Sequence, residues 1–167
     1  MTKITGTIIT LNAEKYILRA IESLKNISDE IIVLDSKSTD STRDIAKSAG
    51  AKVYTQEFLG DGLQKKEASN FASNSWIFSL DADEYLDQDL IDFIKKTDLS
   101  NISYDSFAFR RKNYCADEWI KAAGFYPDYV TRLYDKSRVN YDSRADHAAI
   151  VSTVSYTHLT LPTNSRV

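Results

Sequence analysis

The sequence has little cysteine and histidine and no long hydrophobic run. Its one cysteine, Cys115, excludes an internal disulfide and a cysteine-based zinc cluster. Its two histidines are His147 and His158, too few for a histidine-based metal site. No apolar run approaches the ~20 residues that span a bilayer, and the first residues lack the apolar core of a signal peptide. We therefore expect a cytoplasmic protein.

Excess positive charge is also absent. The chain carries 21 Lys and Arg against 24 Asp and Glu, a formal net charge of −3, which argues against a nucleic-acid partner. Hydrophobic residues make up 43% of the 167 residues, as in ordinary globular proteins. This length is sufficient for one domain with a real core.

The last residues, 154–167, do not read like the rest of the chain. Their sequence, which begins Val154-Ser-Tyr-Thr-His158, resembles the translation of a transposon-type sequencing-library adapter. We therefore expect this tail to be a cloning or sequencing remnant, to be left out of fold reasoning. The alternative is a genuine C-terminal segment that favours β-structure.

Apolar patterns alternate between strand and helix along the first part of the chain. Short β-branched runs predict buried strands at residues 7–11, 30–34, 51–55 and 76–80. Helical spacing of apolar residues predicts helices at 14–25, 41–49, 63–74 and 88–96. This order predicts an α/β fold with a mostly parallel sheet flanked by helices.

The pattern changes after residue 100. Residues 106–110 alternate as a half-exposed strand does, and aromatic residues become dense beyond them. We therefore predict a first subdomain at residues 1–100 and a second, partial subdomain at 101–153.

Polar residues follow three of the predicted strands. In an open α/β sheet, ligands bind outside the carboxyl ends of the strands, so these residues should lie along one edge. The triplet Asp81-Ala82-Asp83 is the strongest feature, since Mg²⁺ and Mn²⁺ prefer carboxylates together with substrate phosphates. The alternative is a solvated acidic turn.

Asp35, at the end of the second strand, has more than one interpretation. An acid in this place can bind the ribose of a dinucleotide, as in a Rossmann-like oxidoreductase. That function needs a glycine-rich turn after the first strand, and residues 10–16 contain no glycine. Asp35 and Asp40 could also simply cap a turn and a helix.

Several ordered motifs together resemble family 2 glycosyltransferases of the GT-A (Rossmann-like) fold, and in particular lipopolysaccharide core β-glycosyltransferases. The first half carries Thr10-Leu-Asn-Ala-Glu14, Asp35-Ser-Lys-Ser-Thr-Asp-Ser-Thr42, Gly62-Leu-Gln-Lys-Lys66 and the segment 76–84. The second half carries Gly124-Phe-Tyr-Pro-Asp128 and Arg132-Leu-Tyr134, which resemble the acceptor-side motif. The sequence departs from the family at Ala13, Lys37, Ser41 and Ala148.

The resemblance implies a donor site for a UDP- or ADP-type sugar nucleotide. It places Thr10, Asn12, Glu14 and Asp35 on the nucleoside, and Lys65 near the phosphates or the sugar. Asp81 would hold ribose, sugar and metal, and Asp83 would be the direct ligand of Mg²⁺ or Mn²⁺.

The resemblance also implies an inverting transfer to a glycan or lipid-linked acceptor in cell-envelope polysaccharide biosynthesis. Such a transfer needs a general base. Asp128 is the first candidate, with Asp117 and Glu118 next, although Pro127-Asp128 could instead form a turn. His147 could bond an acceptor or a phosphate. A lipid-linked acceptor would bring a peripheral contact with the inner face of the membrane, and a binding module without turnover is the main alternative.

Overall fold

A computed structural model describes residues 2–115, 118–120, 128–141, 150–151 and 157–166. Of the residues considered above, Asp117, His147, Ala148, residues 124–127 of the acceptor-side motif and residues 154–156 of the tail lie outside this part of the chain.

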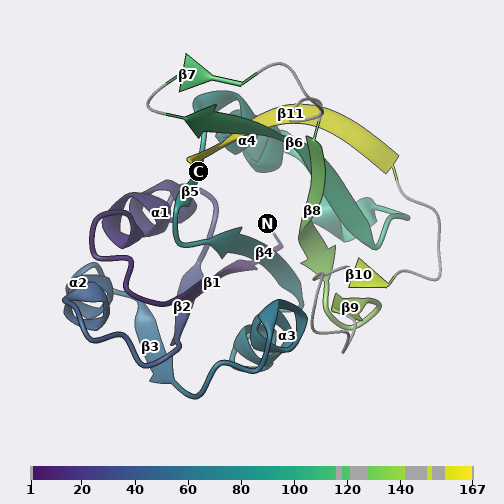
Figure 1. Cartoon of the computed structure of the whole chain (residues 1–167). Helices are drawn as coiled ribbons and strands as arrows, with labels where there is room; N and C mark the ends of the chain where they lie inside the picture. The colour runs from purple at the N-terminus through teal and green to yellow at the C-terminus, as the bar shows by residue number, and fades with distance from the viewer. Residues whose placement is uncertain (1, 116–117, 121–127, 142–149, 152–156, 167) are drawn as a thin grey trace.

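The first half of the chain forms a parallel sheet. Its strands are β1 (Ile4–Thr10), β2 (Glu30–Asp35), β3 (Lys52–Thr55) and β4 (Trp76–Asp81), in the spatial order β3-β2-β1-β4. Helices α1 (Ile17–Leu24), α2 (Thr42–Ser48) and α3 (Asp61–Asn70) connect them, and α4 (Gln88–Lys96) follows. Figure 1 shows α1 and α2 together on one side of these strands and α3 on the other. The predicted α/β fold is confirmed.

The second half extends the same sheet. Strand β8 (Asp128–Asp135) lies antiparallel to β4, and β6 (Ser106–Cys115) lies antiparallel to β8. Beyond β6 come β11 (Thr157–Arg166) and β5 (Glu84–Leu86). Strand β7 (Glu118–Trp119) pairs with the last two residues of β6, Tyr114 and Cys115. The short pair β9 (Asn140–Tyr141) and β10 (Ile150–Val151) forms a second sheet, and η1 (Leu99–Asn101) is a single 3₁₀ turn. The expected parallel arrangement thus holds for the first half, and the complete sheet is mixed.

The central strands are buried on both faces. On β4, Trp76, Phe78 and Leu80 point into the larger core with α1 and α4, whereas Ile77 joins the smaller core beside α3. A strand that is buried on both faces reads as a continuous apolar run instead of an alternating one. The same alternation directs Asp81 to the face that carries Ile77, because side chains two apart on a strand share a face.

Two local expectations need correction, and the tail needs a separate remark. Residues 106–109 are buried, not half-exposed, because β6 lies inside the sheet between β8 and β11. The helix predicted at 63–74 runs instead over Asp61–Asn70, and the Phe71 ring stacks on Tyr54 at 3.9 Å between ring centroids. The tail expected to be an adapter remnant contributes β11, whose backbone pairs with β6 and β5. Its origin stays a prediction.

Glu30 ties four segments together at the amino end of the parallel strands. Its carboxylate accepts hydrogen bonds from the Thr5 hydroxyl at 2.9 Å, the Ser73 amide at 2.8 Å and the Lys52 ammonium at 2.6 Å. Partial burial opposes ionisation, but these bonds outweigh it and lower the pKa of Glu30 from 4.5 to about 2. Between these two pH values, Glu30 therefore binds fewer protons in the folded state than in the unfolded state.

Glu30→Gln should consequently change the acid stability of the protein. The stabilisation by Glu30 is present above its unfolded pKa of 4.5 and disappears as the pH falls toward its folded pKa of about 2. We expect the variant to be less stable than the wild type by about 2 kcal/mol near neutral pH, with the difference shrinking as the pH falls through this window. Urea unfolding at a series of pH values measures this. Glu22→Gln, at an exposed site, is the control, and an equal loss at every pH would contradict the prediction.

Candidate functional site

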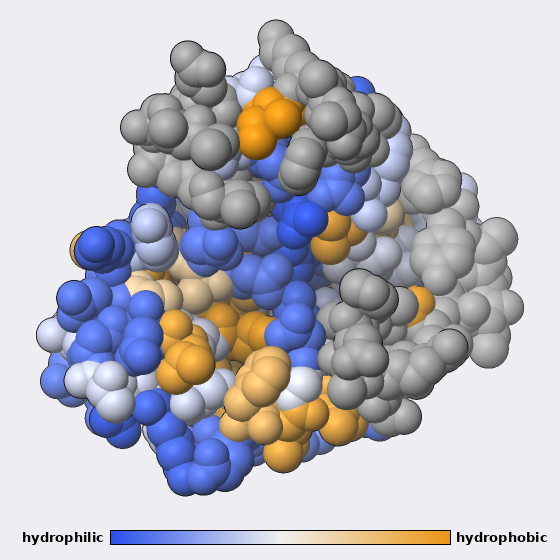
Figure 2. Space-filling model, viewed as in Figure 1, coloured by the Kyte–Doolittle hydropathy of each residue, from blue (hydrophilic) through white to orange (hydrophobic). Residues whose placement is uncertain are grey.

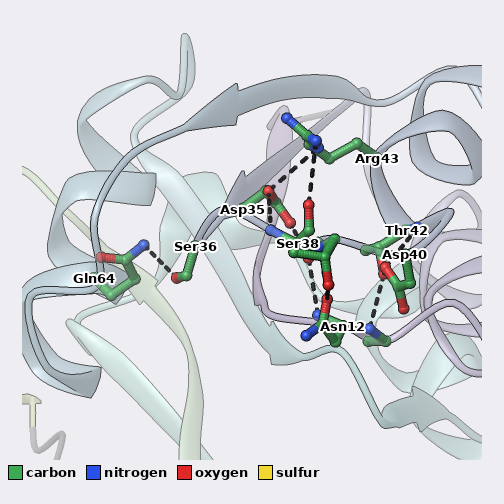
Figure 3. A network of polar contacts seen from close by, with 10 residues as sticks. Asn12, Asp35, Ser36, Ser38, Asp40, Thr42, Arg43 and Gln64 are labelled. Carbon is green, nitrogen blue, oxygen red and sulfur yellow. Dashed lines mark hydrogen bonds and ion pairs between the residues drawn. The ribbon is translucent and has the colours of Figure 1, made fainter.

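The loops that follow β1 and β2 are bound to each other at the carboxyl edge of the sheet (Figure 3). The Asn12 amide donates to Ser38 Oγ at 2.8 Å, and Asn12 Oδ1 accepts from the Thr39 amide at 2.8 Å. The Ala13 amide donates to Thr42 Oγ1 at 2.8 Å. Asn12 adopts a φ of 50°, a left-handed conformation that asparagine tolerates better than most residues. Without a glycine, this turn is held in shape by the neighbouring loop.

Asp35 is at the centre of this network. Its side chain is fully buried and accepts hydrogen bonds from the Ser38 amide at 2.9 Å and from the Ser38 hydroxyl. Arg43 Nε lies 3.7 Å from the same carboxylate, and its guanidinium also donates to the Ser38 carbonyl at 3.2 Å. In this conformation Asp35 holds the second loop, and its buried carboxylate would have to become accessible before it could contact a nucleoside.

Thr10 and Glu14 lie on either side of Asn12. Thr10 is buried, and its hydroxyl has no hydrogen-bond partner in the described part of the chain. Glu14 is exposed and accepts a hydrogen bond from the Ser41 amide at 3.1 Å, while its own amide donates to Asp40 at 3.1 Å. The structure therefore brings the four predicted nucleoside contacts to one pair of interlocked loops.

At the end of β4, two cations hold Asp81. Lys65 Nζ, from α3, lies 2.8 Å from Oδ1, and Arg132 Nη2, from β8, lies 2.9 Å from Oδ2. Burial alone would raise the pKa of Asp81, but the positive charges of Arg132 and Lys65 outweigh burial and lower it far below its usual range. Both carboxylate oxygens are thus engaged, and Lys65, which is buried, contacts an acid.

The ion pairs continue from Asp81 into the second half of the chain. Arg132 also contacts the buried carboxylate of Glu84, which lies 3.4 Å from Arg111 Nη1. Arg111 Nη2 and Nε in turn lie 2.7 Å and 2.9 Å from Asp128 Oδ2. We call the six residues Lys65, Asp81, Arg132, Glu84, Arg111 and Asp128 the charge chain. Their signs alternate, and Figure 2 shows hydrophilic residues gathered in the middle of this face, where β4, β6 and β8 meet.

Asp83 lies beside the charge chain but outside it. The residue is exposed, and among the described residues it makes no ion pair and no side-chain hydrogen bond with another residue. Partial desolvation and the negative charge of Asp81 raise the pKa of Asp83. In the described ranges no three His, Cys, Asp or Glu side chains cluster as a complete metal site. A single unpaired carboxylate still fits Mg²⁺ or Mn²⁺, because such ions use one or two carboxylates and take further ligands from phosphates and water.

Sequence analysis included Arg132 and Glu84 only within motifs and assigned no role to either, and it did not single out Arg111. Arg132 lies on β8 directly before Leu133 and Tyr134, and an arginine beside apolar residues within a strand is a usable signal because an arginine is rarely buried unless it is paired. Arg111 on β6 offers no such signal. Asp128 lies in the charge chain, whereas the Glu118 side chain lies outside the description and only its backbone pairing with Cys115 is defined.

Comparison with known proteins places this arrangement in a family. The chain matches the model of glycosyl transferase family 2 over residues 7–155, and it belongs to that family. It is 41% identical over 145 residues to an uncharacterised glycosyltransferase of Rickettsia typhi, covering 84% of this chain and 49% of that protein. It is 30% identical over 159 residues to the lipopolysaccharide core biosynthesis glycosyltransferase LpsC of Rhizobium meliloti, covering 89% of this chain and 57% of LpsC. The chain spans about half the length of these relatives.

Solved structures share the fold. Residues 1–349 of Staphylococcus aureus TarS, solved in complex with UDP-GlcNAc, superpose with a TM-score of 0.59 at 22% identity, covering 69% of this chain and 36% of that chain. Glucosyl-3-phosphoglycerate synthase from Mycobacterium tuberculosis, in complex with Mn²⁺, UDP and glucosyl-3-phosphoglycerate, superposes at 0.56 and 23%, covering 66% and 44%. The GT-A fold is confirmed, and the family assignment decides against the dinucleotide-dependent oxidoreductase.

Ser38→Ala tests the hydrogen bonds that join the loops after β1 and β2, which we call the loop lock. The substitution removes the hydroxyl that donates to Asp35 and accepts from the Asn12 amide, and it leaves a buried carboxylate with fewer donors. We expect a loss of about 2 kcal/mol in the free energy of unfolding, measured by urea titration. Ser48→Ala, at the exposed end of α2, should change it by less than about 0.5 kcal/mol. Equal free energies of unfolding for the two variants would show that the loop lock does not stabilise the fold.

Proposed function

We propose that the whole protein is an inverting glycosyltransferase that moves a sugar from a nucleotide-sugar donor with the help of Mg²⁺ or Mn²⁺. The observation that carries the proposal is the difference in surroundings between Asp81 and Asp83. Asp81 is neutralised by Lys65 and Arg132, whereas Asp83 is exposed and makes no ion pair with a described residue. A carboxylate beside another acid is stabilised when a cation binds.

The donor that we propose is a UDP-sugar, with an ADP-sugar as the alternative. Membership of family 2 supports a nucleotide-sugar, and the similar structures that hold UDP-GlcNAc or UDP support the uridine nucleotide. The nucleoside would lie against the interlocked loops after β1 and β2, in contact with Thr10, Asn12, Glu14 and Asp35. Thr10 has an unused hydroxyl there.

The metal would be held by Asp83, with Asp81 next to it. When bound, a divalent cation neutralises the diphosphate and stabilises the charge that develops on the leaving group. Lys65 already forms an ion pair with Asp81. Its positive charge would therefore act on the donor phosphates from behind Asp81 and not by direct contact.

Asp128 is the base that we propose for the transfer. An acceptor hydroxyl oxygen would form a bond to the anomeric carbon while the bond from that carbon to the diphosphate oxygen breaks, and the hydroxyl proton would pass to Asp128. Arg111 engages Oδ2 of this carboxylate, and Oδ1, which makes no ion pair with a described residue, would take the proton. The nucleoside diphosphate leaves with the electrons of the broken bond.

The acceptor that we propose is a glycan or a lipid-linked saccharide of the cell envelope. Similarity to LpsC, named for lipopolysaccharide core biosynthesis, supports this role. A lipid-linked acceptor would bring the protein to the inner face of the membrane from the cytoplasm. In the described part of the chain, no helix has the length and apolar character needed to cross a bilayer.

Nucleotide-sugar binding without turnover is the second candidate function. It is favoured by the ion pair that Asp128 makes with Arg111, at 2.7 Å from Nη2, because this contact engages the proposed base. Both candidates share the donor site, so turnover separates them and binding does not.

Asp83→Asn should abolish metal-dependent binding of UDP. We expect the affinity for UDP in the presence of Mn²⁺ to fall by about 100-fold or more, because the substitution removes the carboxylate charge that would bind the metal directly. Isothermal titration calorimetry of UDP with and without Mn²⁺ gives the measurement. Asp89→Asn, an exposed acid in the first turn of α4, should bind as the wild type does. Wild-type affinity in Asp83→Asn would sink the assignment of the metal ligand.

Asp128→Asn should separate binding from transfer. We expect turnover of a UDP-sugar to fall by about 10²- to 10⁴-fold, since an amide cannot take the acceptor proton, while Mn²⁺-dependent UDP binding is retained. Release of UDP in a coupled assay measures turnover. Full turnover in this variant would rule out Asp128 as the base. A wild-type chain that binds UDP with Mn²⁺ but never releases UDP from the sugar nucleotide would favour the second candidate.

A further inference from the structure

The turn that carries Asp83 is held at both ends by one guanidinium. Asp81 closes β4 and Glu84 opens β5, with only Ala82 and Asp83 between them. Arg132 Nη2 donates to Asp81 Oδ2 at 2.9 Å and also to Glu84 Oε1. The other oxygen of Glu84 accepts from the Asp81 amide at 3.3 Å, so the two ends are joined directly as well.

We propose that Arg132 is a positioning residue that clamps this turn and thereby presents Asp83 to the metal-bound donor. The proposal rests on the proposed function of Asp83. Arg132 would not touch the metal itself. It would act through Asp81 and Glu84, which fix the backbone on each side of Asp83.

The other cations of the charge chain cannot replace this contact. Lys65 pairs with Asp81 and not with Glu84, while Arg111 pairs with Glu84 at 3.4 Å and not with Asp81. Arg132 alone bridges the two acids in the described structure. Three acids within four residues repel one another, and a shared cation between two of them offsets that repulsion while it sets their spacing.

Stability alone gives a poor reason for this residue. Arg132 is only 2% exposed, and its Nη1 group has no hydrogen-bond partner in the part of the chain that the structure describes. Burying ion pairs is often no more stabilising than burying apolar side chains of the same volume, and an unpaired buried N–H is unfavourable. A role in presenting Asp83 accounts for a buried arginine at this position.

The clamp also joins the two halves of the chain. Arg132 belongs to β8, and it lies 51 and 48 residues along the sequence from Asp81 and Glu84. Strand β8 lies directly beside β4 in the sheet, with Phe78 opposite Leu133, so the arginine reaches the end of β4. The metal end of the donor site is therefore completed by the second half of the chain.

The test compares Arg132→Lys and Glu84→Gln with the wild type in the full chain. Lysine keeps the charge but offers a point charge in place of a planar fork, and glutamine keeps the shape of Glu84 but removes its charge. Free Mn²⁺, measured by electron paramagnetic resonance in the presence of saturating UDP, reports the affinity for the metal. We expect each variant to bind Mn²⁺ about 10-fold more weakly or worse, as substitutions behind a metal ligand do.

Controls separate a positioning role from a purely structural one. Arg138→Met removes another arginine ion pair from the second half, that with Asp105 at 3.1 Å, and Val139→Ala opens a small space in the core beside α3. Both should keep wild-type Mn²⁺ affinity, even where Val139→Ala lowers the melting temperature. Glu84→Gln retains Arg132. It therefore still tests the clamp if Arg132→Lys does not fold.

The outcomes are distinct. If the wild type binds UDP without any dependence on Mn²⁺, the proposed metal site fails and the clamp fails with it. If the wild type depends on Mn²⁺ but folded Arg132→Lys and Glu84→Gln bind the metal as tightly as the wild type, the clamp is overturned while the proposed function stands. Weaker Mn²⁺ binding in both variants but in neither control supports the clamp.

Discussion

The pairing of Arg132 with Asp81 and Glu84 is the contact on which the site depends. It joins the last strand of the parallel half to the antiparallel half, and it lies where the acids at the end of β4 would otherwise repel one another. The charge chain extends this pairing to Lys65 on α3 and to Asp128 at the start of β8. Of the three acids at the end of β4, Asp81 and Glu84 form ion pairs in this chain, whereas Asp83 forms none with a described residue. Local electrostatics thus separate Asp81, which is held by two cations, from Asp83, which stays exposed.

Much of the parallel half could be predicted from sequence because its signals are local. The helix at Gln88–Lys96 has the predicted bounds, and the strands at the ends of which Asp35 and Asp81 stand lie where apolar runs predicted them. The second half was harder, since β6 and β8 find their places by pairing with strands that are distant in sequence. Residues 106–109 look half-exposed only until their neighbours on both sides are known.

The same distinction holds for the site. Sequence placed Thr10, Asn12, Glu14, Asp35, Asp81 and Asp83 at one edge, because carboxyl ends of parallel strands meet there. It did not reveal that Asp35 and Lys65 already have partners within the protein, or that Arg132 reaches Asp81. Those contacts depend on tertiary distances and on the direction of side chains in neighbouring strands. Residue type and spacing carry neither kind of information.

The hydrogen bonds between the loops after β1 and β2 have a consequence for anyone who wishes to alter donor preference. Asn12, with its left-handed backbone, takes its shape from Ser38 and Thr39 across the gap, and Ala13 is held by Thr42. The two segments therefore form one hydrogen-bonded unit. If residues 11–16 were replaced by those of a relative while residues 36–42 were kept, the hydrogen-bond donors and acceptors of the two loops would no longer match. Recombination between homologues should succeed where its crossover points lie outside both segments.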